Sequence, residues 1–405
     1  MPTRALALVL ILFSLALHAQ TTKPRIRALT AFVRIDVTHP ELDDAVRMLR
    51  DAKHTYEQHG YEVETIRITT QPFSEIISAL KPEEALPDFL ALNEISKREN
   101  VLLNIGVILP TPQVASQAEQ LANILTQADQ LEASLIVAQD DGIHWTAVKA
   151  AAHVMKVLAE HTPHSDGNFR FVATAMLAPY GPFFPGSYHT GAGHQFSVGL
   201  ESANVVETVL KAHPQDITAA EKALSNELAH YDSECEKIAQ EIAKHSGWTY
   251  AGLDPTPAPL ADISIGDAIE KFMQAKFGSS GTMTSAAMIT RAVKSVPVKQ
   301  VGYAGLMVPV LEDATLARRW SEGAFSIDAL LAYSSVCGTG LDTVPLPGEI
   351  SEEQLDRIIG DMASLAYKWK KPLSARLQPV AGKKAGDKTD FHDPHLVDAI
   401  IQKLP

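Results

Sequence analysis

Apolar and polar residues follow two different periods along this chain. Nearly continuous apolar runs, which are typical of strands buried on both faces, occur at 27–36, 100–109 and 169–177. Between them lie segments such as 40–59, where apolar residues recur every three or four positions and predict amphipathic helices. This alternation predicts an α/β fold with a mainly parallel sheet covered by helices.

The remaining segments continue the same alternation. Further strands are expected at 61–69, 135–139, before residue 201, and at 250–253, 301–310 and 373–380. Further helices are expected at 82–99, 114–132, 145–160, 204–245 with an interruption near Pro214, 265–277, 282–294, 327–335 and 352–367, and a short one at the end. We therefore expect residues 20–405 to form a single large α/β domain. Its strands form either a barrel surrounded by helices or an open parallel sheet.

The first 19 residues have the pattern of a cleaved secretion signal. Arg4 supplies a positive start, residues 5–17 supply an apolar core, and Leu17-His18-Ala19 offers a cleavage site before Gln20. This apolar run is shorter than the roughly 20 residues that cross a bilayer, and we expect no membrane span in the mature chain. The protein is therefore expected to be exported to the periplasm or the exterior.

The charge balance narrows the expected partners. Without Arg4, 34 basic residues stand against 48 acidic ones, which gives a formal charge of −14. An acidic surface disfavours nucleic acids and anionic membranes as partners and leaves a small molecule as the expected one. Two cysteines, Cys235 and Cys337, are too few for a disulfide-built scaffold, although a single bridge between them stays open.

A long loop after the strand at 169–177 is the first candidate for a functional site. It contains three prolines, four glycines, Tyr188, His189 and His194. Loops of this length without secondary structure are uncommon in compact domains unless they are functional or disordered, and the aromatic residues disfavour disorder. Such a loop can point both histidines at one divalent metal, with Asp254 or Glu201 as a carboxylate ligand. Alternatively, His189 acts as a general acid or base, or only binds the loop backbone.

Several motifs occur in a fixed order along the chain. They are Phe171–Ala175 with Pro185-Gly186-Ser187-Tyr188-His189, Tyr250-Ala251-Gly252-Leu253-Asp254, Gly305–Val310 with Glu312-Asp313, Val336–Asp342, and Ala375-Arg376 through Pro379 to Phe391. The ordered set resembles the bacterial family called domain of unknown function 711, whose fold is related to the barrel of pyruvate formate-lyase. The chain departs from the family before Asp140 and after Phe391. The resemblance implies an α/β barrel but no particular reaction, because the family is largely uncharacterised.

Three residues in these motifs are candidates for catalysis. Asp254 ends a strand, where functional residues of parallel α/β folds gather, although it can also cap the following turn. Cys337 lies in a turn of small residues and would need a partner such as His189 to lower its pKa. A glycyl radical is not expected, because no recognisable glycine-radical motif lies near the end of the chain.

Three further residues are candidates for substrate binding, namely Tyr188, Arg376 and Asp342. Arg376 can pair with a substrate carboxylate or with a structural acid. The leading hypothesis is an enzyme, of hydrolase or lyase type, that acts on a small polar molecule at a barrel mouth by acid/base or metal-assisted chemistry. Its catalytic residues would be His189, Asp254 and Cys337, and these should then converge on one cavity. The alternative is an exported protein that binds a small molecule without catalysis.

Overall fold

A computed structural model describes residues 23–261 and 263–404 of the protein. The strands are β1 (Arg25–Phe32), β2 (Val63–Thr69), β3 (Leu102–Ile108), β4 (Leu131–Gln139), β5 (Gly142–Ile143), β6 (Phe171–Ala175), β7 (Gln195–Glu201), β8 (Thr249–Asp254), β9 (Gly340–Pro347) and β10 (Leu373–Val380). The helices are α1 (Asp43–Gln58), α2 (Phe73–Ser78), α3 (Pro82–Glu99), α4 (Val114–Gln127), α5 (Trp145–His161), the 3-10 helix η1 (Pro163–Arg170), α6 (Ala203–Ala212), α7 (Ile217–Ser246), α8 (Ile265–Met273), α9 (Thr282–Lys294), α10 (Ala314–Ser321), α11 (Ile327–Ser334) and α12 (Glu352–Trp369). The predicted secretion signal lies outside the described residues.

One mixed sheet organises the molecule, in the order β8-β7-β1-β2-β3-β4-β6-β10-β9, with β5 added to β4. Strands β1, β2, β3, β4 and β6 run parallel to one another, as do β7 with β8 and β9 with β10. The pairings of β1 with β7 and of β6 with β10 are antiparallel and join the three parallel blocks. The prediction of a mainly parallel sheet is therefore confirmed.

The hydrogen-bonded strands form an open sheet, the second of the two expected architectures. The irregular segment 299–313 nevertheless contacts both edge strands. The amide of Leu253 in β8 donates to the carbonyl of Lys299 at 2.8 Å, and the amide of Val310 donates to that of Asp342 in β9 at 3.0 Å. The strand predicted at 301–310 is absent, since positive φ angles at Gly302 and Ala304 break an extended conformation.

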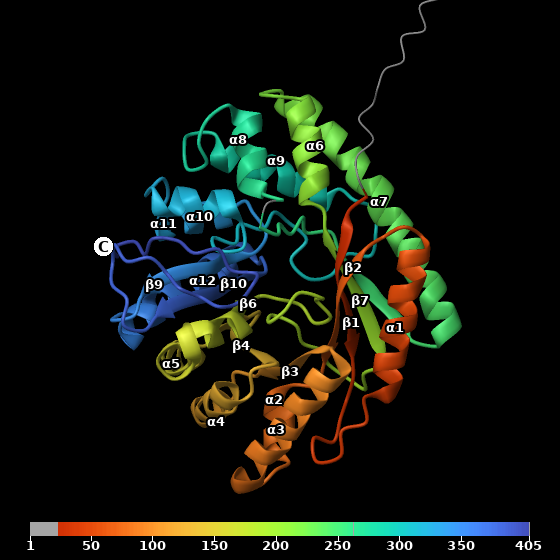
Figure 1. Ribbon diagram of the computed structural model, residues 1–405, viewed down its shortest axis with the longest axis vertical. Coiled ribbons are helices and arrows are strands. Elements are labelled where there is room, and N and C mark those ends of the chain that lie inside the picture. The colour runs from red at the N-terminus through yellow and green to blue at the C-terminus, as the bar shows by residue number, and fades with distance from the viewer. Residues whose placement is uncertain (1–22, 262, 405) are drawn as a thin grey trace, which may run out of the picture.

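Helices cover the outer side of this sheet, as Figure 1 shows. Helix α1 packs on β1 and β2, and α4, α5 and α12 pack near β3, β4 and β10. Local sequence fixes individual ends: Ser351 and Gln354 form a capping box at the start of α12. Buried aliphatic and aromatic residues of both layers form one large core cluster. No helix in the described part of the chain is long and apolar enough to cross a membrane.

The β6–β7 loop crosses the inner face of the sheet. Thr30 Oγ1 of β1 donates to the carbonyl of Pro182 at 2.9 Å, and Asn104 Nδ2 of β3 donates to that of Pro185 at 2.7 Å. The hydroxyls of Thr69 in β2 and Ser187 lie 2.7 Å apart. In Figure 1 this loop occupies the middle of the molecule, between β6 on one side and β1 on the other. Most of the middle of the loop singled out from the sequence is therefore buried against the inner face of the sheet.

Three local differences separate the structure from the sequence prediction. Strand β9 was missed because it contains Pro345 and Pro347, and an edge strand tolerates proline since one side of its backbone has no strand partner. Helix α10, which has eight residues, was not predicted either. The predicted final helix is wrong: residues 391–404 form turns and isolated pairings, including one between Lys388 and Ile400.

Candidate functional site

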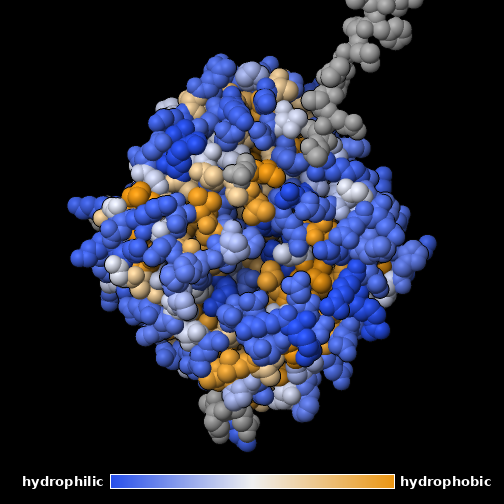
Figure 2. All heavy atoms as spheres, in the orientation of Figure 1, coloured by the Kyte–Doolittle hydropathy of each residue, from blue (hydrophilic) through white to orange (hydrophobic). Residues whose placement is uncertain are grey.

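A cavity of about 400 Å³ lies on the inner side of the sheet, near the amino-terminal ends of β1, β2, β3, β4 and β6. Its lining is charged and aromatic: Arg25, Arg27, Glu62, Glu64, Thr65, Arg67, Leu102, Glu132, Phe169, Val172, Phe183, Phe184, Pro185, Gly186, Ala258, Leu260, Tyr303, Met307, Glu312, Thr339, Asp342, Ser374, Arg376 and His395. Figure 2 shows apolar side chains gathered near the middle of one face, ringed by hydrophilic ones. The volume is that of a site for a small molecule.

The wall formed by β1 and β2 is a network of ion pairs centred on Arg27. The buried Arg27 guanidinium donates to Glu64 at 3.1 Å, to Glu201 at 3.0 Å and to Glu312 at 3.3 Å. Arg25 contacts Glu62, Glu64 and Glu201 at 3.2 to 3.5 Å. Burial raises the pKa of Glu201 to about 8, with the neighbouring Glu64 adding to the shift. These contacts fix the positions of the paired charges on this wall.

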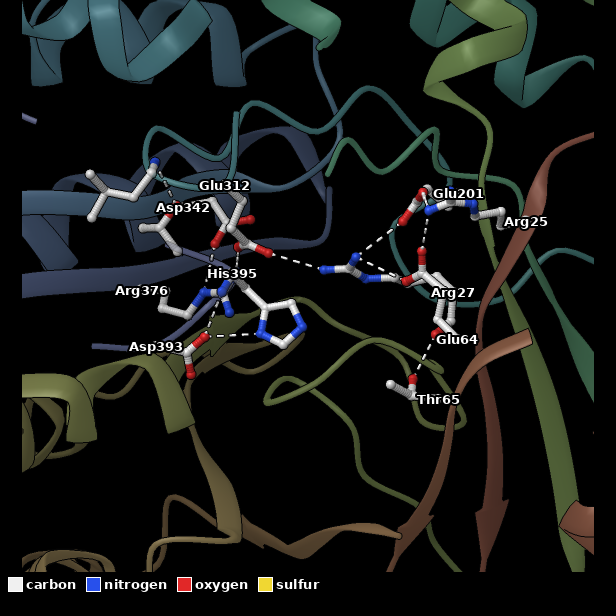
Figure 3. Close-up of polar contacts among 12 residues, drawn as sticks. Arg25, Arg27, Glu64, Thr65, Glu201, Glu312, Asp342, Arg376, Asp393 and His395 are labelled. Atoms are coloured by element: carbon white, nitrogen blue, oxygen red, sulfur yellow. Dashed lines mark hydrogen bonds and ion pairs between the residues drawn. The ribbon is translucent and has the colours of Figure 1, made fainter. Parts of the chain in front are cut away.

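The opposite wall, formed by β9, β10 and segment 299–313, is built around Arg376. This arginine donates to Asp342 at 2.8 Å and to Glu312, and its guanidinium lies 4.7 Å from the centre of the Phe169 ring. Glu312 therefore contacts both Arg376 and Arg27, and Figure 3 shows it joining the two walls. Arg376 and Asp342, both expected to bind substrate, do line the cavity, but each already binds the other.

Two charged residues in the lining differ from all the others. The only hydrogen bond that the Arg67 side chain donates among the described residues runs from its Nε to Thr65 Oγ1 at 2.8 Å. Burial, with a contribution from nearby Arg27, lowers the pKa of Arg67 to about 10. The side chain of Glu132, the second residue of β4, has no hydrogen bond or ion pair with any described residue. Burial raises the pKa of Glu132 to about 7, against the opposing effect of Arg67 and two other arginines.

Aromatic rings enclose the space beside these two residues. The Arg67 guanidinium lies 5.1 Å from the centre of the Phe184 ring, which belongs to the β6–β7 loop. The rings of Phe169 and His395 stack with centres 6.2 Å apart, and the His395 Nδ1 lies 2.9 Å from Asp393. His395 belongs to the C-terminal segment that follows Phe391, so this departure from the family pattern contributes to the site. The cavity thus offers flat apolar surfaces next to charges.

Asp254 lies outside the cavity lining but organises part of it. Its carboxylate is buried and accepts hydrogen bonds from Thr256, from the amide of Tyr303 at 2.8 Å and from the amide of Ala304 at 3.1 Å. Burial raises the pKa of Asp254 to about 6, while these hydrogen bonds oppose the shift. Asp254 therefore holds the loop that places Tyr303 in the cavity, and it has the turn-capping contact considered from the sequence.

The two loop histidines are not brought together on a metal position. His189 is buried and its Nε2 lies 2.8 Å from the carbonyl of Val33, which is the backbone-binding alternative; burial lowers its pKa. His194 stacks on Trp248 with ring centres 4.2 Å apart and lies 3.5 Å from Asp44. Among residues 23–261 and 263–404, no three His, Cys, Asp or Glu side chains are arranged to hold a metal ion.

Cys337 and Tyr188 are also buried away from the cavity lining. Burial raises the pKa of the Cys337 thiol, which disfavours the reactive thiolate, and both Cys235 and Cys337 are free. The Tyr188 hydroxyl donates to the carbonyl of Leu177 at 2.7 Å, and burial raises its pKa to about 12. The expected convergence of His189, Asp254 and Cys337 on one cavity is therefore not observed.

Sequence reasoning missed most of the cavity, although a signal for it was present. Charged residues interrupt otherwise apolar strands at Arg25 and Arg27 of β1, Arg67 of β2 and Glu132 of β4. A charge in a strand buried on both faces is costly unless it is paired or faces a site. These charged residues indicate a site at the amino-terminal halves of the strands, whereas the sequence prediction placed the site at their carboxyl ends.

Comparison with known proteins finds relatives that are named only as UPF0210 proteins. The chain is 28% identical over 382 residues to a UPF0210 protein of Pyrobaculum arsenaticum, covering 89% of this chain and 82% of the relative. It is 33% identical over 286 residues to one of Pyrobaculum aerophilum, covering 67% of this chain and 62% of the relative. A Bifidobacterium longum UPF0210 protein is 28% identical over 355 residues, covering 82% of this chain and 78% of the relative.

These relatives correct and extend the resemblance found in the sequence. Pyrobaculum is an archaeal genus, so the description of the family as bacterial was too narrow. The model of the family described as Uncharacterised ACR (DUF711) matches residues 20–392 and therefore includes the strands before Asp140 that carry Arg67 and Glu132. The chain belongs to the DUF711 family, whose UPF0210 members occur in bacteria and archaea.

Proposed function

We propose that the cavity is the active site of an enzyme that acts on a small polar molecule with an anionic group. Arg67 binds the anion, and Glu132 accepts or donates a proton. The observation that carries this proposal is the pairing pattern of the lining. Every other arginine and every other carboxylate of the cavity is in an ion pair, and these two are not.

The chemistry of the two residues supports their separate roles. A guanidinium presents planar pairs of N–H donors that match a carboxylate, and the terminal nitrogens of Arg67 are not used by any described residue. A carboxyl group with a pKa of about 7 is populated in both protonation states near neutral pH, which is the condition for general acid/base catalysis. The paired arginines and acids around them form a fixed polar frame.

The earlier candidates take supporting roles in this proposal. Arg376 and Asp342 fix one wall, and Asp254 is a positioning residue that holds the loop of Tyr303. The metal-assisted alternative lacks support, since the His189 ring contacts the backbone carbonyl of Val33, the residue that follows β1.

Two substitutions test the proposal with matched controls. Arg67→Met and Glu132→Gln remove one charge each with little change in shape, and Arg98→Met and Glu94→Gln make the same changes on the exposed face of α3. The wild type is incubated with amino acids, hydroxy acids, dicarboxylates and simple carboxylic acids, with binding measured by calorimetry and conversion by proton NMR. Arg67→Met should weaken binding about tenfold or more. Glu132→Gln should lower kcat about 100-fold or more.

The outcomes separate this proposal from its alternative. Unchanged binding in Arg67→Met, or unchanged turnover in Glu132→Gln, would contradict the assigned roles. Saturable binding with no product after prolonged incubation would instead favour a non-catalytic binding protein. Melting temperatures of all four variants establish that each is folded.

Two further features belong to the proposal. We propose that residues 1–19 direct export, which N-terminal sequencing of the protein recovered from its producing cells would test.

We also propose kinship with the pyruvate formate-lyase barrel. Its support is the backbone pairing of segment 299–313 with both β8 and β9, which brings the two edges of the sheet under one segment.

A further inference from the structure

The relative position of Arg67 and Glu132 narrows the class of ligand. Arg67 of β2 pairs in register with Leu102 of β3, and Asn104 of β3 pairs with Glu132 of β4. The two charged side chains thus project into the cavity from β2 and β4, the strands on either side of β3. The backbones of β2 and β4 are about 10 Å apart, because neighbouring strands are spaced by about 4.8 Å. The two side chains attract each other but do not form an ion pair, so space between them remains for a molecule.

We infer that the ligand is a small zwitterion whose carboxylate binds Arg67 and whose ammonium group binds Glu132, an assignment that rests on the proposed function of this cavity. A zwitterion gives each unpaired residue its opposite charge and adds no net charge to a polar frame that is otherwise paired. A dicarboxylate would place a second negative charge near Glu132. A simple amine would leave Arg67 without an anion.

The surroundings of the two residues add a second property to this ligand. Phe184 lies against Arg67, and Phe169 lies on the opposite wall against Arg376. Flat apolar surfaces beside charged groups favour a ligand with an apolar or aromatic side chain. An α-amino acid with such a side chain combines all three features. In this complex Glu132 is the ionised partner of the ammonium group, which keeps its proton.

Three compounds that share a 2-phenylethyl skeleton distinguish a zwitterionic ligand from a simple acid or a simple amine. Phenylalanine has both charges, 3-phenyllactate has only the carboxylate, and phenethylamine has only the ammonium group. We expect phenylalanine to bind the full-length protein about tenfold or more tightly than either of the others in calorimetry. Arg67→Met should weaken binding of phenylalanine and phenyllactate but not of phenethylamine. Glu132→Gln should weaken binding of phenylalanine and phenethylamine but not of phenyllactate.

Proton linkage gives a readout that does not depend on activity. An ammonium group beside Glu132 lowers its pKa, so phenylalanine should release a fraction of a proton at about pH 7, measured by titration in two buffers of different ionisation enthalpy. Glu132→Gln should abolish this release, while Glu94→Gln on α3 should preserve it.

The two proposals fail in different ways. Phenyllactate binding as tightly as phenylalanine, proton uptake in place of release, or no binding of phenylalanine at millimolar concentration would overturn the zwitterion assignment. The role of Arg67 as an anion-binding residue would still stand if Arg67→Met weakened phenyllactate binding. If Arg67→Met left phenyllactate binding unchanged, the proposed function itself would fail.

Discussion

Ionisable side chains without an ion-pair partner distinguish this protein at the smallest scale. Arg67 and Glu132 face a cavity, and the absence of an ion pair at either has a functional interpretation. Asp232 of α7 is different: it is fully buried, and neither carboxylate oxygen has a hydrogen-bond partner among the described residues. Burial raises its pKa well above the usual value, and Asp254 adds to the shift. Folding therefore favours the protonated form of Asp232 over the ionised form, relative to the unfolded chain.

Asp232→Asn should stabilise the protein, by about 1 kcal/mol or more near pH 8, because it removes the cost of keeping a proton on a buried acid. Denaturant unfolding near pH 8 and near pH 5 measures this gain, which should shrink at the lower pH. Asp51→Asn on the exposed face of α1 is the control and should change little. A lower free energy of unfolding for Asp232→Asn at pH 8 would mean that this acid has an unseen stabilising partner.

Among the elements, the irregular segment 299–313 connects the edges of the sheet to the cavity. Its turn at Gly302 has φ +72 and lies against the carboxylate of Asp254, so an added Cβ would overlap Asp254 Oδ2. That carboxylate also binds the amides of Tyr303 and Ala304. A local backbone conformation thus decides where Tyr303, a cavity residue, is placed.

Gly302→Ala should destabilise the protein more than Gly323→Ala. Gly323 has a similar φ of +70 but nothing within 4 Å of an added Cβ, so it reports only the cost of a left-handed conformation, about 1 kcal/mol. The overlap at Gly302 should add about 1–3 kcal/mol. Thermal and denaturant unfolding of the two variants measures the difference. Equal losses of stability in the two variants would show that the Asp254 side chain moves aside at no measurable cost in free energy.

The elements also show how far local sequence patterns lead. The bounds of α3, α9 and β10 match the prediction, since apolar periodicity and terminal residues are local properties. The segment 301–310, which was predicted as a strand, is irregular, and the missed strand β9 is an edge strand that contains prolines. Their conformation depends on pairing with strands distant in the sequence, which no local pattern reports.

For the molecule as a whole, buried acids with raised pKa values govern how stability depends on pH. Burial raises the pKa of Asp254 to about 6, of Glu132 to about 7 and of Glu201 to about 8. At each of these sites the folded state binds more protons than the unfolded state over the range between the two pKa values. The contribution to the free energy of unfolding therefore falls as pH rises through that range.

We expect the melting temperature of the ligand-free protein to be lower at about pH 8.5 than at about pH 6. Carboxylates with lowered pKa values, such as Asp393, are already ionised at both pH values and do not change this sign. Glu132→Gln should make the decrease smaller, because it removes one of the titrating groups. A melting temperature that rises over this range would contradict the raised pKa values of these acids.

The sequence by itself determined the α/β class, most helices and strands, the family, and the unusual character of the loop between β6 and β7. Those features depend on local periodicity and on an ordered set of motifs. Only the tertiary structure decided the site. Arg67, Glu132, Arg376 and Glu312 come from separate parts of the chain, and the curvature and pairing of the sheet bring them to one cavity. The same packing gave His189, Asp254 and Cys337 their buried surroundings, which residue type and spacing alone do not reveal.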